Sequence, residues 1–453
     1  MELYPWQKKV IEESVRYPKR ALFAAPRLGK TLATTTMMAN LIPGENSLVV
    51  APLSVCGVWK GELEQQGIRS QPLYLASLVE AASALYEGVD GAVILNYDKL
   101  PDLLFALKKW KPQGLVFDES HLLKNPQSAR SKAARRLATS PTFLRILTGT
   151  PSPNHYGDLW AQMTLVHPEV WGRTWTPFAQ RYLIRDAIYP SKIIGHNNVP
   201  ELRGMLNADA DIVRREDVFG PDTWQVVERM VDLPEGARKA YDTLVKEWLL
   251  YHEQAGEVSV DHTLKRLVRL QQLCSGYLRN EEGQDYQMHS AKIDAVLADL
   301  DEIVESEEKA VIFHRFTWEG DHLAEAIQRR FPHVPVFKMD GNTSSSNRTA
   351  GEAGIRDCPT SAIMVAQTRT AALGISFAEA THALFVSQSF SFVDEEQARD
   401  RVYKPGVNRC VTYYRCVGTV DEFIAKVIAN KTGIHDAVTH ADIREMSYGF
   451  LRR

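Results

Sequence analysis

The chain has 453 residues, a length that accommodates two or three domains, and 44% of them are hydrophobic and 24% charged, as in an ordinary globular protein. The formal net charge is −3, so any surface that binds nucleic acid has to be a local patch. No apolar run is long enough to span a bilayer, residues 1–10 hold no apolar signal core, and the five cysteines are scattered without a CxxC pair. We therefore expect a cytoplasmic protein without a membrane partner, a zinc site or a disulfide framework.

The first motif is a candidate adenine contact. Residues 3–7 read Leu-Tyr-Pro-Trp-Gln and precede a helical pattern that runs to about residue 15. The amide of Gln7 offers both a donor and acceptors, as recognition of an adenine edge requires. Taken alone, such a glutamine is more often a surface residue, so this interpretation depends on the motifs that follow.

A phosphate-binding loop comes next. Residues 21–25 have the apolar character of a strand, residues 26–31 read Pro-Arg-Leu-Gly-Lys-Thr, and a helical pattern continues to about residue 41. In this layout backbone N–H groups and the helix N-terminus face phosphates, the lysine reaches the β- and γ-phosphates, and the threonine hydroxyl lies on Mg²⁺. Ala24 stands where the GxxxxGK[ST] pattern has its first glycine, so the strict pattern fails at one position. We predict that ATP and Mg²⁺ are bound by Arg27, Gly29, Lys30 and Thr31.

Two adjacent acids end the next apolar run. Residues 114–117 are typical of a buried parallel strand, and Asp118-Glu119-Ser120-His121 follows directly. Open α/β sheets bind ligands at the carboxyl edge of their strands. We predict that Asp118 holds Mg²⁺ and that Glu119 orients or deprotonates an attacking water. The alternative is a strand end with solvated acids; the phosphate loop upstream and the arginines downstream favour the site.

The first part of the chain is predicted to form one sheet. Further apolar runs at residues 47–52, 92–97 and 144–147 alternate with helical spacers, which is typical of a doubly wound parallel sheet. The last run leads into Thr148-Gly149-Thr150-Pro151. Thr148 and Thr150 would end a strand beside the acids, where they could sense a γ-phosphate. An ordinary Thr-Gly turn is the alternative.

The middle of the chain has a different character. Aromatic and charged residues increase over residues 167–277, and long helical periodicity runs through 238–252 and 264–273. The basic run at residues 265–269 fits a DNA-facing helix and a solvated face equally well. Strand patterns then return at residues 309–314, 336–341, 362–366 and 383–386.

A charged stretch near the end of the chain has helical spacing. Gln397, Asp400, Arg401 and Lys404 fall at positions i, i+3, i+4 and i+7, which predicts that they share one helical face. Cations on that face could stabilise the charge of a phosphoryl-transfer transition state, as an arginine finger does. The alternative is a salt-bridged surface helix.

The order of these motifs resembles the superfamily 2 helicases and, within them, the Swi/Snf-type ATPases. The matching stretches, which cover nearly the whole chain, are LYPWQ, the loop ending in LGKT, VVAPLSVCGVWKGEL, VILNYD, VFDESHLLKN, LTGTPSPN, KAVIFHRFTWEGDHLAEAI, MDGNTSSSNR and QARDRVYKPG. The resemblance implies an α/β protein with two RecA-like lobes, each a parallel sheet flanked by helices, and a helical insertion and linker between them. It places the ATP-binding lobe at residues 1–165, the insertion and linker at 166–288, and the second lobe at 289–453.

The resemblance also implies the roles of single residues. The catalytic set would be Glu119, Arg401, Lys404 and Gln397. Residues that sense the nucleotide or couple its hydrolysis to movement would be His121, Thr148, Thr150 and Gly374. Nucleic acid would be contacted by Pro52, Ser54, Trp59, Asn96, Thr368 and Arg369. The family usually has arginine at the position of Lys404 and glutamine at that of Val407; lysine cannot make the planar fork of arginine, so this departure affects the rate of ATP turnover.

The implied activity is ATP hydrolysis with Mg²⁺ while the protein tracks on duplex DNA. We expect a monomer, cytoplasmic in a bacterial or phage-infected cell, or nuclear in a eukaryote. One alternative is an RNA or single-strand helicase of superfamily 2. Another is an ATP-gated clamp on nucleic acid with weak hydrolysis, which the departures at Ala24, Lys404 and Val407 support.

Overall fold

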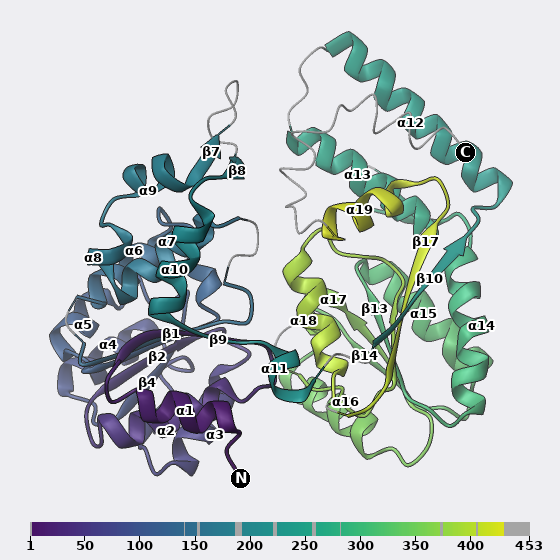
Figure 1. The fold of residues 1–453 in the computed structure, drawn as a ribbon. Coiled ribbons are helices and arrows are strands. Elements are labelled where there is room, and N and C mark those ends of the chain that lie inside the picture. Colours follow the sequence, from purple (N-terminus) through teal and green to yellow (C-terminus); the bar gives the residue numbers. More distant parts are fainter. Residues whose placement is uncertain are drawn as a thin grey trace. The chain divides into compact units, whose positions relative to one another are not determined.

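The computed structural model describes residues 2–139, 141–151, 155–185, 193–220, 224–255, 260–280, 282–371, 375–404 and 406–429. The chain divides into two compact units, Met1–Asp222 and Thr223–Arg453, each built around its own sheet (Figure 1). No helix in the described parts of the chain combines the length and the apolar character that crossing a bilayer requires.

The sheet of the first unit has the strand order β3-β4-β2-β5-β6-β1-β9, and all neighbouring strands are parallel. Its strands are β1 (Lys19–Ala24), β2 (Ser47–Ala51), β3 (Ser70–Gln71), β4 (Ala92–Asn96), β5 (Gly114–Asp118), β6 (Phe143–Leu147) and β9 (Ala210–Val213). Because β6 pairs with β1 on one side and β5 on the other, the loops after these three strands leave the same edge of the sheet side by side.

Helices cover both faces of this sheet. Along β2, Val49 and Ala51 enter one apolar core while Leu48 and Val50 enter the other, as the alternation of a strand requires. The first core is covered by α1 (Pro5–Glu13), α2 (Lys30–Leu41) and α3 (Cys56–Gln65), which lie together in Figure 1. The second is covered by α4 (Leu78–Glu87), α5 (Leu104–Trp110), α6 (Ala129–Leu137) and α7 (Gly157–Val166).

The first unit contains further short elements besides this sheet and the helices that cover it. Its elements are η1 (Ser120–Leu123), α8 (Pro168–Trp171), α9 (Trp175–Tyr182), β7 (Leu183–Arg185), β8 (Ile193–His196), α10 (Val199–Asp209) and α11 (Arg215–Phe219). The stretch expected to be an insertion and linker, residues 166–288, is divided between the units, since β9 joins the first sheet and β10 the second.

The sheet of the second unit has the order β10-β17-β16-β13-β15-β14 and is also parallel. Its strands are β10 (Trp224–Val231), β13 (Ala310–His314), β14 (Val336–Met339), β15 (Ile363–Gln367), β16 (His382–Phe385) and β17 (Arg409–Cys416). One face packs on α14 (Ala291–Glu305) and α15 (Thr317–Arg330), and the other on α16 (Ser345–Asp357), α17 (Thr368–Ala371) and α18 (Phe392–Val402). The predicted α/β class with two parallel sheets flanked by helices is confirmed.

A third apolar core in the second unit lies among helices. It is formed by α12 (Glu235–Ala255), α13 (Val260–Cys274) and α19 (Val420–Ala429), next to the hairpin of β11 (Tyr277–Arg279) and β12 (Asp285–Gln287). At its border the ammonium of Lys292 is 2.7 Å from the carboxylate of Asp421, with both side chains at most 5% exposed. Burial alone would lower the pKa of Lys292, but Asp421 raises it above its usual value.

Candidate active site at the edge of the first sheet

The predicted phosphate loop connects β1 to α2. Arg27 and Gly29 both have positive φ, of 63° and 80°, so the loop turns sharply before the first turn of the helix. The Lys30 ammonium donates to the carbonyl of Ala24 at 2.7 Å, which shows that it can reach back across the loop it follows. Ala24, the departure from the usual glycine, is a fully buried strand residue whose carbonyl faces this lysine.

Gln7 lies against the same loop. Its amide nitrogen donates to the carbonyls of Leu28 at 3.3 Å and Gly29 at 3.0 Å, and its oxygen accepts from the backbone N–H of Tyr4 at 2.8 Å. A side chain on Gly29 would approach the Gln7 amide to 2.5 Å, so glycine is required there. Gln7 is 1% exposed, and both ends of its amide are engaged by backbone groups. In this structure Gln7 stabilises the phosphate loop through these hydrogen bonds. Its contact with adenine stays a prediction.

Asp118 ends β5 and is held at three atoms. The indole of Trp59 donates to its Oδ2 at 2.8 Å, the N–H of Glu119 donates to its Oδ1 at 2.9 Å, and the hydroxyl of Tyr97 donates to its carbonyl at 2.6 Å. Burial and the neighbouring Glu119 raise the pKa of Asp118 to about 6, while Trp59 and Lys30 oppose that rise. The hydrogen bonds from Trp59 and Glu119 therefore fix the direction of the carboxylate.

Glu119 and the residues after β6 form one hydrogen-bonded group. Glu119 directly follows β5 and is in the left-handed region, with φ 49°. Its Oε2 lies 3.2 Å from His121 Nδ1 and accepts from the Thr148 hydroxyl at 3.3 Å, and the two latter groups are 3.0 Å apart. Because β5 and β6 are neighbours, the two predicted strand-end motifs meet here as expected.

The loop after β6 is tied into the same group. The N–H of Thr150 donates to the Thr148 hydroxyl at 3.1 Å. The hydroxyl of Thr150 is buried and has no hydrogen-bond partner among the residues that the structure describes. Such an atom at this edge is suited to a polar ligand group.

The residues predicted to meet nucleic acid lie in different settings. In the first unit Ser54 is exposed and Pro52 half-buried in the turn before α3, but Trp59 is 0% exposed and Asn96 only 7%. A direct contact by Trp59 is therefore inconsistent with the structure, because its indole is buried against Asp118. In the second unit Arg369 is exposed, whereas Thr368 is buried and donates to the carbonyl of His314 at 3.2 Å. Gly374 lies outside the described residues.

The predicted cationic face in the second unit is only partly present. Gln397, Asp400 and Arg401 lie on α18, and Asp400 is buried. The helix ends at Val402, however, so the prediction that Lys404 shares their face is wrong. The sequence supplies the reason, since the residue before a proline is disfavoured in the helical region and Pro405 follows. The Lys404 ammonium instead donates to both oxygens of Glu379, at 3.0 and 3.1 Å.

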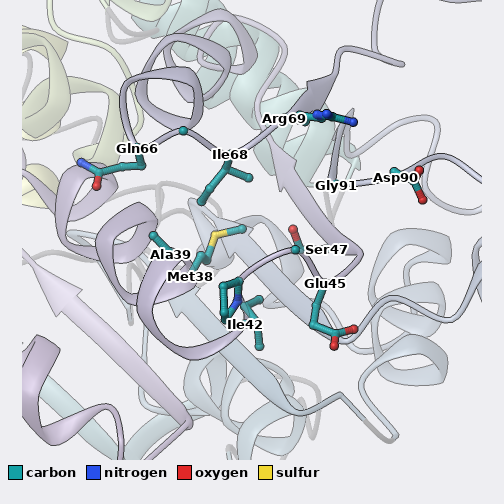
Figure 2. Close-up of a pocket in the computed structure, with 13 residues that line it drawn as sticks. Met38, Ala39, Ile42, Glu45, Ser47, Gln66, Ile68, Arg69, Asp90 and Gly91 are labelled. Atoms are coloured by element: carbon teal, nitrogen blue, oxygen red, sulfur yellow. The ribbon is translucent and has the colours of Figure 1, made fainter.

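A separate pocket of about 430 Å³ lies at the opposite edge of the first sheet (Figure 2). Met38 and Ile42, from the C-terminal part of α2, line it together with Ser47, the first residue of β2. Since the phosphate loop precedes the N-terminal end of that same helix, this pocket is not the predicted nucleotide site.

Comparison with known proteins agrees with this geometry. The SNF2-related domain matches residues 21–277, more than half of the chain, and the helicase conserved C-terminal domain matches residues 292–406. The chain belongs to the SNF2-related family. The resemblance predicted from the motifs is thereby confirmed.

Two named relatives of this SNF2-related chain are much longer proteins. The chain is 27% identical to the SWI/SNF-related matrix-associated actin-dependent regulator of chromatin subfamily A-like protein 1 of Xenopus tropicalis, over 95% of this chain but 44% of the relative. It is 23% identical to the mouse DNA annealing helicase and endonuclease ZRANB3, over 96% of this chain and 40% of that protein. It thus spans less than half the length of either relative.

Among solved structures, the SWI2/SNF2 ATPase core of Sulfolobus solfataricus in complex with dsDNA is 21% identical, with a TM-score of 0.44. The match covers 100% of this chain and 95% of that one, but so low a score adds nothing to the fold described above.

The residues at this edge have the chemistry to hold a nucleotide and a divalent cation. A hydroxyl on Thr31 and a carboxylate on Asp118 are the hard oxygen ligands that Mg²⁺ prefers. The sharply turned loop and the N-terminus of α2 offer backbone N–H groups to phosphates, and Lys30 adds a cation. The hydroxyl of Thr150, for which the described parts of the chain offer no hydrogen-bond partner, is a further polar group at the same edge.

Proposed function

We propose that this SNF2-related protein is a DNA-dependent ATPase that hydrolyses ATP, with Mg²⁺, and uses the energy to track on duplex DNA. The observation that carries the proposal is the hydrogen-bonded group of Glu119, His121 and Thr148, next to the phosphate loop. A glutamate held by two neighbours at a sheet edge is oriented as a catalytic base needs to be. Solvated acids at a strand end would not require such contacts.

Binding is assigned to the first unit. Lys30 and the loop N–H groups would hold the phosphates, and Thr31 and Asp118 would hold Mg²⁺, which when bound neutralises charge on the phosphate oxygens. Asp118 is suited to this task because the Trp59 indole and the Glu119 N–H fix the direction of its carboxylate. Each of its oxygens accepts one hydrogen bond and keeps further acceptor capacity for a ligand.

Proton transfer is assigned to Glu119. Its carboxylate would take a proton from the attacking water, and His121 and Thr148 would keep it in the required direction. Arg401 on α18 would stabilise the charge that develops on the transferred phosphoryl group when the two lobes close on the nucleotide. Lys404 is assigned only a supporting part, since its ammonium is paired with Glu379.

Duplex DNA is the proposed partner. Ser54 and Arg369 are exposed, as residues that contact a phosphate backbone have to be, and the printed name of one relative describes a DNA annealing helicase. Contacts of this kind would make the affinity for DNA fall as salt rises. We propose that the protein acts as a monomer.

The test is the rate of ATP hydrolysis with duplex DNA, single-stranded DNA, RNA and no nucleic acid. We expect duplex DNA to stimulate hydrolysis most. Stronger stimulation by RNA would replace the proposal with an RNA helicase.

A second candidate function rests on Lys404. Because this residue is paired with Glu379, the site has one cation fewer than the family pattern offers, which is what a clamp on DNA with weak hydrolysis would show. Tight nucleotide-dependent DNA binding without stimulated turnover would favour the clamp.

A further inference from the structure

Trp59 connects the carboxylate proposed to hold Mg²⁺ to a surface turn. Trp59 lies in the first turn of α3, and its backbone N–H donates to the carbonyl of Val55 at 3.2 Å. Val55 closes the turn that begins at Pro52, since its own N–H donates to the Pro52 carbonyl at 2.9 Å. Two backbone hydrogen bonds therefore connect this turn to Trp59.

The contact at the other end is a buried, charge-assisted hydrogen bond. Trp59 Nε1 is 2.8 Å from Asp118 Oδ2, with Trp59 0% and Asp118 6% exposed. Indole has one donor and no acceptor, and the only acceptor that the described residues give it is this carboxylate. Packing alone would require only an apolar ring at this position, such as that of phenylalanine. The hydrogen bond to Asp118 requires the indole N–H as well.

A second aromatic reaches the same residue from another strand. Tyr97 follows directly after β4, whose last residue is Asn96, and its hydroxyl donates to the carbonyl of Asp118 at 2.6 Å. Each of the two segments predicted to contact nucleic acid in this unit, at residues 52–59 and at Asn96, is thus connected to Asp118 by a hydrogen bond from an aromatic side chain. The two bonds act differently, because Trp59 directs the carboxylate and Tyr97 only the main chain.

We propose that Trp59 is a positioning residue that directs the Asp118 carboxylate toward Mg²⁺ and links it to the turn at residues 52–55. The inference rests on the proposed function, because it takes Asp118 as the Mg²⁺ ligand and this turn as a DNA contact. It gives Trp59 a part in the motor without touching DNA.

The chain offers a matched control. Trp110 is buried in the same unit, at the end of α5, and its indole donates to the carbonyl of Val89 at 2.8 Å. Trp59→Phe and Trp110→Phe each remove one indole donor and a similar volume, but only the first change faces Asp118. Thermal unfolding of both variants measures the structural cost that they share.

The experiment is equilibrium binding of a fluorescent, non-hydrolysable ATP analogue as Mg²⁺ is varied, in the full-length protein. In Trp59→Phe we expect the Mg²⁺ concentration at half-maximal binding to rise about 10- to 100-fold, as for other groups that orient a metal ligand. Binding without Mg²⁺ should stay as in the wild type, and Trp110→Phe should shift the midpoint less than about twofold. Tyr97→Phe, which removes only the hydrogen bond to the Asp118 main chain, should shift it in the same direction but less. If Trp59→Phe does not fold, Trp59→Met, which also lacks the indole donor, replaces it, and a midpoint equal to that of Trp110→Phe overturns the positioning role.

The link to the turn has its own readout. In the wild type, saturating duplex DNA should change the affinity for the Mg²⁺-bound analogue, and in Trp59→Phe that factor should fall toward one. An unchanged factor would overturn the link. Equal midpoints for Trp59→Phe and Trp110→Phe would overturn the positioning role and leave the proposed function standing. A wild type whose analogue binding does not depend on Mg²⁺ would instead refute the proposed function, and the inference with it.

Discussion

The edge of the first sheet and the segment that begins with α18 were both predicted from short motifs, and they differ in how far the prediction held. At the first, Asp118, Glu119 and Thr148 lie at the ends of neighbouring strands, so sheet pairing brings them together. At the second, helical spacing was extended to Lys404, although the helix ends at Val402. Motifs at strand ends are positioned by the whole sheet, whereas a helical face extends only as far as its helix.

The largest expected effect concerns the part of the second region that remains on the helix. Arg401→Ala should lower kcat about 10³- to 10⁵-fold, the contribution of an arginine that stabilises the phosphoryl-transfer transition state. ATP binding should weaken much less. The measurement is single-turnover hydrolysis with saturating duplex DNA.

Arg399 provides the control on the same helix. Its guanidinium lies over the ring of Trp224, 5.9 Å from the centroid, so Arg399→Ala should leave turnover nearly unchanged. If Arg401→Ala behaved like Arg399→Ala, α18 would be a salt-bridged surface helix without a part in catalysis.

Within the first region the largest effect is expected at Glu119. Glu119→Gln keeps the shape of the side chain but removes the base, so turnover should fall about 10²- to 10⁴-fold with nucleotide affinity unchanged. Glu64→Gln, on the exposed end of α3 where Glu64 pairs with Lys60 at 3.4 Å, should change neither quantity. Normal turnover in Glu119→Gln would assign water activation to another residue.

A smaller effect is expected from Lys30→Ala, and it concerns binding. The phosphates would lose a charge-assisted hydrogen bond, which corresponds to about a 10- to 100-fold weaker nucleotide affinity. The measurement is titration with a fluorescent ATP analogue. An unchanged affinity would mean that the Lys30 ammonium stays on the Ala24 carbonyl when nucleotide binds.

The smallest effect is expected at Lys404. Its pair with Glu379 is about half exposed, and such pairs contribute at most about 1 kcal/mol. Lys404→Arg and Glu379→Gln should therefore each change turnover less than about threefold. A loss above tenfold in Lys404→Arg would show that Lys404 leaves Glu379 for a phosphate during the reaction.

Much of the fold could be predicted because buried parallel strands are continuous apolar runs, such as those ending at Ala51 and Asp118. Strands β9 and β10 were missed. The sequence of β10, WQVVERMV, is neither a continuous apolar run nor a regular alternation, and both strands lie in a stretch with predicted helical character. The end of α18 could have been predicted, because Pro405 disfavours helix at the residue before it.

The contacts around Asp118 could not be predicted from local sequence. Trp59 and Asp118 are 59 positions apart, and only the order of strands in the folded sheet brings α3 onto the end of β5. The motif therefore predicts that Trp59 contacts nucleic acid at the surface, whereas the structure buries its side chain. The same holds for Lys404 and Glu379, 25 positions apart.

The measurement that tests the central claim most directly is displacement of a third strand from a DNA triplex, because it requires movement along a duplex. The wild type should displace the strand only with ATP and Mg²⁺, and Glu119→Gln should bind the duplex without displacing it. Displacement by Glu119→Gln at the wild-type rate, or duplex-stimulated hydrolysis in the wild type without any displacement, would contradict the claim that hydrolysis drives tracking on DNA.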